Sequence, residues 1–175
     1  MTGTSNMAEK QRIVSSSHLV SDRAAELSEL EFALILSGNA FNRWVVRCMR
    51  AAGMPDLSIL DILVLHNVNS REREKSLSEV CFVLNVEDSH LVNYALKKLR
   101  KQGLVDGIKR GKEVHYATSK EGRELCQRYR EVREACLIET FERLGVNRDE
   151  VGDVAKTLRA ISGVYDQASR AASAM

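Results

Sequence analysis

Residues 87–118 read EDSHLVNYALKKLRKQGLVDGIKRGKEVHYAT, and this stretch decides the fold that the chain is expected to adopt. Its pattern predicts a helix, a short strand, a tight basic turn and a second strand. Between Asn93 and Lys112 it holds seven lysines or arginines and one acidic residue, Asp106, although the formal net charge of the whole chain is only +2. Positive charge concentrated on a helix and a following hairpin is typical of a nucleic-acid-binding segment.

The predicted helix of this stretch has two chemically distinct faces. Asp88 or Ser89 can cap its first turn, and Gly103 ends it after Gln102. At 100° per residue, one face is apolar and is expected to be buried; it consists of Val92, Ala95, Leu96 and Leu99. The opposite face is polar and basic; it consists of His90, Tyr94, Lys97 and Lys101, with Asn93 and Lys98 on its flanks. A generic surface helix more often alternates Glu with Lys, and this one has no acidic residue between Ser89 and Leu104.

A second short helix and a hairpin are predicted on either side of this helix. Residues 76–85, SLSEVCFVLN, open on the capping-box pair Ser76 and Glu79, and Asn85 suits a left-handed turn. Two short helices joined by such a turn form a helix-turn-helix. Next, LVDGIK and EVHYAT alternate around Arg110-Gly111-Lys112, which predicts a hairpin with a cationic tip. A helix-turn-helix followed by this hairpin is a winged helix.

Long amphipathic helices are predicted on both sides of the winged helix. The first starts after Ser21 or Asp22 and ends before Pro55. The second opens on a capping-box pattern, Thr118 with Glu121, and the last begins at Asn147 with an apolar heptad seam. These helices extend beyond one small domain, so we expect them to pack against a second copy of the chain.

The predicted fold class is therefore mainly α with a small β-hairpin wing, a winged helix-turn-helix flanked by long dimerisation helices. Four segments are expected: a flexible tail at 1–20, a dimerisation helix at 21–55, the winged helix at 56–118 and further dimerisation helices at 119–175. Within the winged helix, 58–68 forms a core helix capped by Ser58 and Asp61, and 70–75 is expected to be a charged, solvated linker.

Composition narrows the class of protein. The 175 residues are 44% hydrophobic and 29% charged. They contain neither an apolar run long enough to span a membrane nor an apolar signal-peptide core, so a cytoplasmic protein is expected. The cysteines at 48, 81, 126 and 136 have neither Cys-x-x-Cys nor zinc-finger spacing, which predicts free thiols. No phosphate loop, metal-ligand cluster or nucleophile motif is found, so we predict neither an enzyme nor a cofactor.

The order of these motifs resembles the MarR family of bacterial transcription regulators. The resemblance is carried by SLSEVCFVLNVEDSHLVNYALKKLRKQGLV, by the wing DGIKRGKEVHYAT and by TSKEGREL, over roughly residues 25–170. It implies a homodimer whose recognition helices enter major grooves and whose wings lie near minor grooves, and it implies a small-molecule effector pocket. The wing is short, and Asp106-Gly107-Ile108 stands where the family commonly has Asp-x-Arg, so Arg110 or Lys112 would have to substitute.

The leading hypothesis is a sequence-specific regulator that binds double-stranded DNA as a homodimer, with recognition helix 88–102 and wing 104–118. The expected phosphate contacts are Lys98, Lys101, Lys109, Arg110 and Lys112. The residues expected at or near base edges are Ser89, His90, Asn93, Tyr94 and Lys97. The alternative is a dimeric winged-helix module that binds protein without specific DNA binding, because a fold alone does not fix a function.

Overall fold

The computed structural model describes residues 17–21 and 23–175, so most of the predicted tail lies outside the described residues. The chain is mostly helical with a β-hairpin wing, as predicted, and a third strand makes the sheet three-stranded and antiparallel. It divides into two compact units, the first ending at Tyr129 and the second covering Arg130–Met175. None of the described helices is long and apolar enough to cross a membrane.

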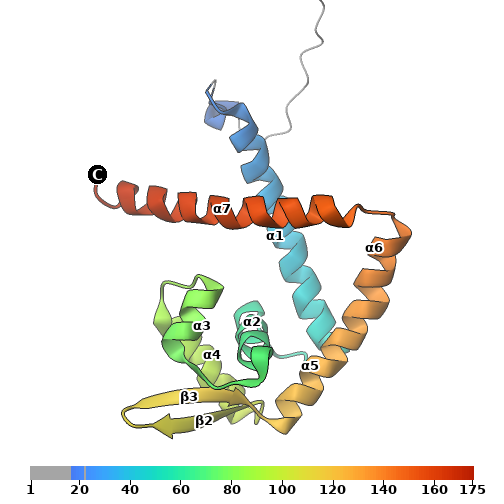
Figure 1. Cartoon of the computed structure of the whole chain (residues 1–175), viewed down its shortest axis with the longest axis vertical. Coiled ribbons are helices and arrows are strands. Elements are labelled where there is room, and N and C mark those ends of the chain that lie inside the picture. Colours follow the sequence, from blue (N-terminus) through green and yellow to red (C-terminus); the bar gives the residue numbers. More distant parts are fainter. Residues whose placement is uncertain (1–16, 22) are drawn as a thin grey trace, which may run out of the picture. The chain divides into compact units, whose positions relative to one another are not determined.

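The first unit contains the winged helix and the long helix before it (Figure 1). Its α-helices are α1 (Ala25–Ala51), α2 (Ile59–Asn69), α3 (Leu77–Leu84), α4 (Ser89–Lys101) and the start of α5 (Lys120–Arg133). Its strands are β1 (Lys75–Ser76), β2 (Val105–Arg110) and β3 (Glu113–Thr118), and two 3-10 turns lie at Ser17–Leu19 and Ser70–Glu72.

Helix α2 lies at the centre of the core of this unit. Its apolar side chains, together with those of the predicted inner face of α4, have at most 1% of their surface exposed; they are Ile62, Val64, Leu65, Val68, Val92, Ala95, Leu96 and Leu99. Burying one such side chain stabilises the fold by about 1.5–3 kcal/mol. The buried face predicted for α4 is thereby confirmed, and its polar face must lie outside the core.

Two hydrogen bonds join helix α5 to the end of α1. The Arg128 side chain donates to the carbonyl of Ala52 at 2.9 Å, and the Cys48 thiol lies 3.5 Å from the carbonyl of Tyr129. All four cysteines are free, as predicted. Burial raises the pKa of Cys126 to about 11, which keeps that thiol protonated and unreactive at neutral pH.

Most of the predicted helix boundaries are confirmed. Complete capping boxes occur at Ser58 with Asp61 and at Ser76 with Glu79, and Asp88 caps α4. The predicted cap of α1 is wrong in the described region: the N-cap is Ala24, whose side chain makes no capping bond.

The capping box predicted at Thr118 and Glu121 is wrong, and the hydroxyl of Ser119 caps the helix instead. The hydroxyl of Ser119 accepts from the backbone N–H of Gly122 at 3.0 Å and donates to the carbonyl of Gly103 at 2.6 Å. Ser119 therefore joins the start of α5 to the end of α4. Gly122 is required there because an added Cβ would lie 2.1 Å from the carbonyl oxygen of Leu104.

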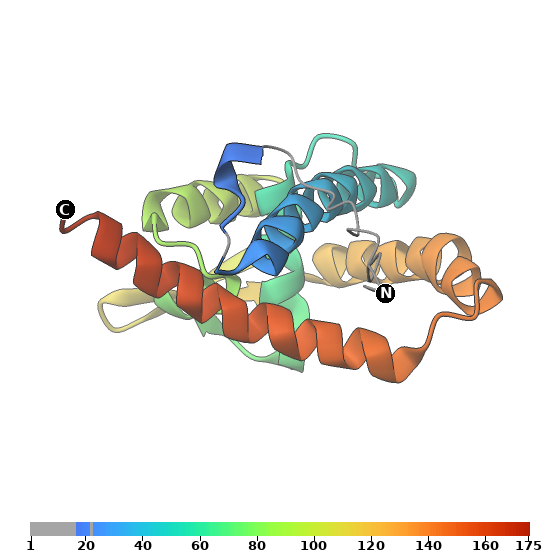
Figure 2. The ribbon, with the colours of Figure 1, turned by 90° about the horizontal axis from the view of Figure 1, so that it is seen from above.

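The hairpin is built as predicted, with a third strand at its side. Strands β2 and β3 pair from Val105 opposite Thr118 to Arg110 opposite Glu113, leaving a two-residue loop in which Gly111 has a φ of 60°. Figures 1 and 2 show this turn projecting beyond α3 and α4. Strand β1 pairs with the outer edge of β3.

The predicted solvated linker at 70–75 is wrong at its end, because Lys75 is buried in β1 with 3% of its surface exposed. Its ammonium donates to the carbonyls of Asn67, Val68 and Ser70. The Asn67 carbonyl also accepts from the N–H and the hydroxyl of Ser70, so Lys75 adds a further donor at the C-terminal end of α2. Burial lowers the pKa of Lys75.

The second unit consists of the end of α5, a π-helical turn (Glu134–Ile138), α6 (Glu139–Arg143) and α7 (Arg148–Ala172). Asn147 caps α7 as predicted, through a bond from the N–H of Asp149. The apolar seam of α7 is exposed at Val151, Val154 and Leu158. In the first unit α1 likewise exposes large apolar side chains, among them Ile35 and Phe41. The expected dimer interface stays a prediction.

We predict that Lys75→Met lowers the free energy of unfolding by about 1–3 kcal/mol, because it removes the ammonium that donates to three carbonyls at the end of α2. Urea unfolding followed by circular dichroism measures this change. Lys120→Met is the matched control, since Lys120 is exposed on α5. Equal unfolding midpoints for the two variants would contradict a capping role for Lys75.

Candidate nucleic-acid interface

The outward face of α4 is the first part of the candidate interface. Ser89, His90, Lys97 and Lys101 are exposed, and Tyr94 has 72% of its surface exposed. Asn93 is half-buried on the flank of this face. The structure therefore brings together on one helix face nearly all the residues that the sequence predicted for it.

Lys98 is placed differently from the prediction. Its ammonium lies 2.6 Å from Oδ2 of Asp61 and 2.8 Å from the carbonyl oxygen of Asp56, at the start of α2. The Asp61 side chain is only 4% exposed, and the same oxygen accepts the N–H of Ser58 at 2.8 Å. Lys98 thus points toward α2 and holds α4 in place, and we withdraw it from the candidate phosphate contacts.

The wing tip is the second part of the candidate interface. Lys109, Arg110 and Lys112 are exposed on the turn of the hairpin. Arg110 makes two hydrogen bonds with the carboxylate of Glu74, at 2.7 and 3.0 Å. These bonds lower the pKa of Glu74 and raise that of Arg110. Arginine binds phosphate through a bidentate contact of the same kind.

A cation that the prediction left out lies between these two parts. Arg100 lines an open groove of about 450 Å³ between α4 and β2. Its neighbours in that groove are Lys97, Lys101, Val105, Asp106 and Gly107. The i, i+3 spacing from Lys97 could have indicated that Arg100 shares its side of the helix.

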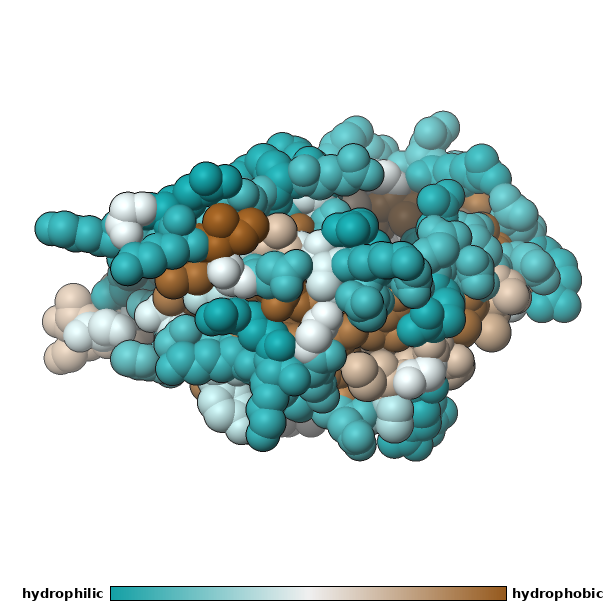
Figure 3. Space-filling model, turned by 90° about the horizontal axis from the view of Figure 1, so that it is seen from below, coloured by the Kyte–Doolittle hydropathy of each residue, from teal (hydrophilic) through white to brown (hydrophobic). Residues whose placement is uncertain are grey.

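The surface around the wing is dominated by hydrophilic side chains when it is viewed from below (Figure 3). On the helix-turn-helix, Phe82 and Val83 of α3 and Leu91 of α4 are more than half exposed, and Val114 on the wing is 39% exposed. The candidate interface is therefore polar and basic at the wing, with apolar groups near the turn between α3 and α4.

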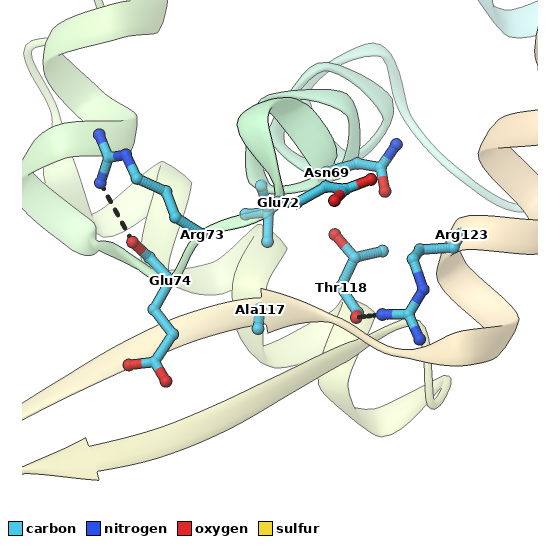
Figure 4. Close-up of a pocket in the computed structure, with 8 residues that line it drawn as sticks. Asn69, Glu72, Arg73, Glu74, Ala117, Thr118 and Arg123 are labelled. Carbon is cyan, nitrogen blue, oxygen red and sulfur yellow. Dashed lines mark hydrogen bonds between the residues drawn. The ribbon is translucent and has the colours of Figure 1, made fainter.

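A polar cavity of about 320 Å³ lies at the root of the wing (Figure 4). Its lining includes Glu72, Arg73, Thr118 and Arg123. The guanidinium of Arg123 donates to the carbonyl of Thr118 at 2.6 Å, and the buried Thr118 hydroxyl has no hydrogen-bond partner among the described residues. The neighbouring Glu74 holds the wing arginine, so the cavity borders the Glu74–Arg110 contact.

Comparison with known proteins identifies the fold. Residues 57–122 match the family model described as "Winged helix DNA-binding domain". A MarR-family transcriptional regulator from Rhodococcus sp. RHA1 superposes with a TM-score of 0.63 at 20% identity, covering 76% of this chain and 91% of that one. The fold is that of the MarR family. The predicted resemblance and fold class are thereby confirmed, while no curated protein sequence matches the chain.

Two further structures with the MarR-like fold were solved with partners. Streptococcus pneumoniae FabT, in complex with DNA, has 18% identity and a TM-score of 0.59, covering 78% of this chain and 94% of that one. CouR from Rhodococcus jostii RHA1, bound to p-coumaroyl-CoA, has 21% identity and a TM-score of 0.63, covering 75% and 90%. At these identities the likeness establishes the MarR fold alone.

We predict that Asp61→Asn lowers the free energy of unfolding by about 1–3 kcal/mol, because it removes the buried negative charge that pairs with Lys98. Urea unfolding of the purified variant measures the loss. The control is Asp56→Asn, since Lys98 contacts the backbone of Asp56 and not its carboxylate. A loss of equal size in the control would show that the Asp61–Lys98 pair contributes nothing specific.

Proposed function

We propose that this protein is a transcription regulator that binds double-stranded DNA sequence-specifically as a homodimer. The observation that carries the proposal is the outward face of α4, where His90, Tyr94 and Lys97 are exposed together beside a projecting basic wing. The MarR fold and the match to a DNA-binding winged helix support it.

The proposed mechanism divides the residues by role. Asn93, Tyr94 and Lys97, with Ser89 and His90 at the start of α4, lie at base edges in the major groove, where Asn can pair with adenine and Lys can donate to guanine. Lys101, Lys109, Arg110 and Lys112 contact phosphates, which supply affinity but little sequence information. The Asp61–Lys98 pair supports the rotation of α4 that its buried apolar face sets, and that rotation decides which side chains reach the bases.

Two copies of the chain are part of the proposal. The exposed apolar side chains of α1 and α7 are the surfaces that we assign to dimerisation, since a helix face of that kind is stable in water only when it is covered. A dimer would read two half-sites roughly 34–36 Å apart. In vitro selection of bound duplexes tests this directly: a palindromic consensus is expected, and an enriched single half-site or no consensus would contradict it.

A small-molecule effector is the second partner that we propose. CouR with its bound p-coumaroyl-CoA supports an effector for a protein of this fold. The polar cavity at the wing root is the place in the described part of the chain that we assign to it, because a ligand there would touch the segment that carries Glu74.

The alternative function is a dimeric winged-helix module that binds another protein. The exposed Phe82 and Val83 on α3 favour it, since apolar side chains at that position suit a protein surface. Binding to random duplex DNA at low ionic strength separates the two functions. A flat response to salt would favour the protein partner, and a steep fall of affinity with salt would favour DNA.

We predict different effects for two lysine variants. Lys97→Ala should weaken discrimination at one base position by about 1–3 kcal/mol, because its ammonium would no longer reach a base edge. Lys112→Ala should weaken binding to all duplexes about equally and reduce the salt slope by roughly one unit. Fluorescence anisotropy on the selected duplex and its single-base variants measures both quantities. A uniform effect of Lys97→Ala would remove Lys97 from the base contacts.

We also predict that Glu74→Gln strengthens binding to any duplex, because it frees Arg110 for phosphate. The pKa of Glu74 is lowered by Arg110, so the Glu74–Arg110 contact is complete above the ordinary glutamate pKa and is lost as the pH falls through the lowered value. Acidification in that range should therefore raise the affinity of the wild type and leave the Glu74→Gln variant unchanged. Anisotropy titrations at several pH values, with Glu113→Gln at the wing as the control, provide the measurement. An equal pH response in all three proteins would exclude competition by Glu74.

A further inference from the structure

The groove between α4 and β2 has a cationic wall, and one of its residues, Arg100, has no part in the proposed base and wing contacts. Lys97, Arg100 and Lys101 stand on the α4 side, and Val105, Asp106 and Gly107 stand on the β2 side. Residues three and four apart on a helix are neighbours, so the three cations lie close together. The groove therefore places three positive charges opposite one carboxylate.

Gly107 leaves the room that the Arg100 side chain occupies. A Cβ added at Gly107 would lie 2.7 Å from both Cζ and Nε of Arg100. The φ of Gly107 is not positive, so the backbone conformation does not demand glycine there. The Arg100 guanidinium lies across strand β2 inside the groove, in the space that a Cβ at position 107 would fill.

The cations of the groove lack carboxylate partners in the described part of the chain. No ion pair within 4.0 Å involves Lys97, Arg100 or Lys101, whereas Lys98 and Arg110 on either side are paired with Asp61 and Glu74. Like charges held together without counterions repel one another, and an anion bound between them would relieve this repulsion.

We propose that this groove seats one phosphate of the DNA strand that runs between the two grooves of the duplex, with Arg100 as its main ligand. The inference rests on the proposed DNA binding. A protein that places a helix in a major groove and a hairpin in the adjacent minor groove must straddle the sugar-phosphate strand between them. The gap between α4 and the wing is where that strand passes, and the planar guanidinium of Arg100 matches two phosphate oxygens.

Arg100→Gln tests the role of the guanidinium in DNA binding. On the selected duplex we expect the dissociation constant to rise about tenfold and the salt slope to fall by about 0.9, with single-base discrimination unchanged. Lys120→Gln, which removes an exposed cation from α5, is the control and should change neither quantity. An unchanged salt slope for Arg100→Gln would overturn the proposal.

Gly107→Ala displaces the guanidinium without removing it. The added Cβ meets only the far end of a flexible side chain, so we expect the hairpin to fold normally. Its DNA affinity should fall in the same direction as that of Arg100→Gln, and urea unfolding checks that the fold is intact. A folded Gly107→Ala protein with wild-type affinity would contradict the assigned position of Arg100.

A neutral methylphosphonate placed at single backbone positions of the duplex identifies the phosphate itself. At one position between the major- and minor-groove contacts, it should weaken the wild type and have no further effect on Arg100→Gln. Additive losses at every position would overturn the proposal. If inorganic phosphate binds the wild type and not Arg100→Gln while the losses on DNA stay additive, the groove is a site for a free anion and the DNA assignment is wrong. If the wild type binds no duplex at all, the proposed function fails as well, which distinguishes the two failures.

Discussion

The carboxylate of Asp61 connects the helix at the centre of the core to the helix that carries the candidate interface. One of its oxygens accepts the N–H of Ser58, which closes the first turn of α2, and the same oxygen accepts the ammonium of Lys98 from α4. Apolar packing between α2 and α4 brings the two helices together and determines which face of α4 is buried. The ion pair is a charged contact on the flank of α4 that supports the same rotation of the helix about its own axis. Every assignment of an α4 side chain to the bases depends on that rotation.

Helix α4 divides its thirteen residues among four directions. Val92 and Leu96 point into the core, Lys98 points toward α2, Arg100 points toward β2, and Tyr94 points into solvent. Each direction satisfies a different physical demand: burial of apolar surface, pairing of a charge, filling of the space above a glycine, and exposure of polar groups. The solvent-exposed face of α4 consists of the positions that are not used for core packing, for the Asp61 ion pair or for the contact with β2. This is why that face is narrow.

Local sequence patterns were enough to predict the α-helices and the hairpin of the winged helix and the two faces of α4, but not strand β1. Helical periodicity and capping boxes depend on residues three or four positions apart, and such spacings are visible in a single sequence. The partners of the charged residues were not predictable in this way. Asp61 and Lys98 are 37 positions apart, and Glu74 and Arg110 are 36 apart, so only the folded chain brings them together.

Lys75 shows the same limit more sharply. A lysine within SREREK has the composition of a solvated linker, because burying a lysine is unfavourable unless its ammonium is fully hydrogen-bonded. The unpaired carbonyls at the end of α2 supply those bonds, and β3 supplies a pairing edge for the backbone. Lys75 is buried because of acceptors that belong to another element, and the sequence around Lys75 carries no information about them.

The pairing of cations inside the fold bears on how a protein with so small a net charge could select among DNA sequences. Non-specific attraction to DNA grows with the number of phosphates that free cations can neutralise. Lys98 is committed to Asp61, and Arg110 is held by Glu74, so fewer free cations face a random duplex than the sequence suggests. In the proposed function, Arg110 would exchange the carboxylate of Glu74 for a phosphate only where that phosphate replaces both of its hydrogen bonds. Internal pairing of this kind would lower the affinity for every DNA sequence. The loss would be smallest for the sequence whose phosphate replaces Glu74 at Arg110, and specificity is the ratio between the affinities for that sequence and for the others.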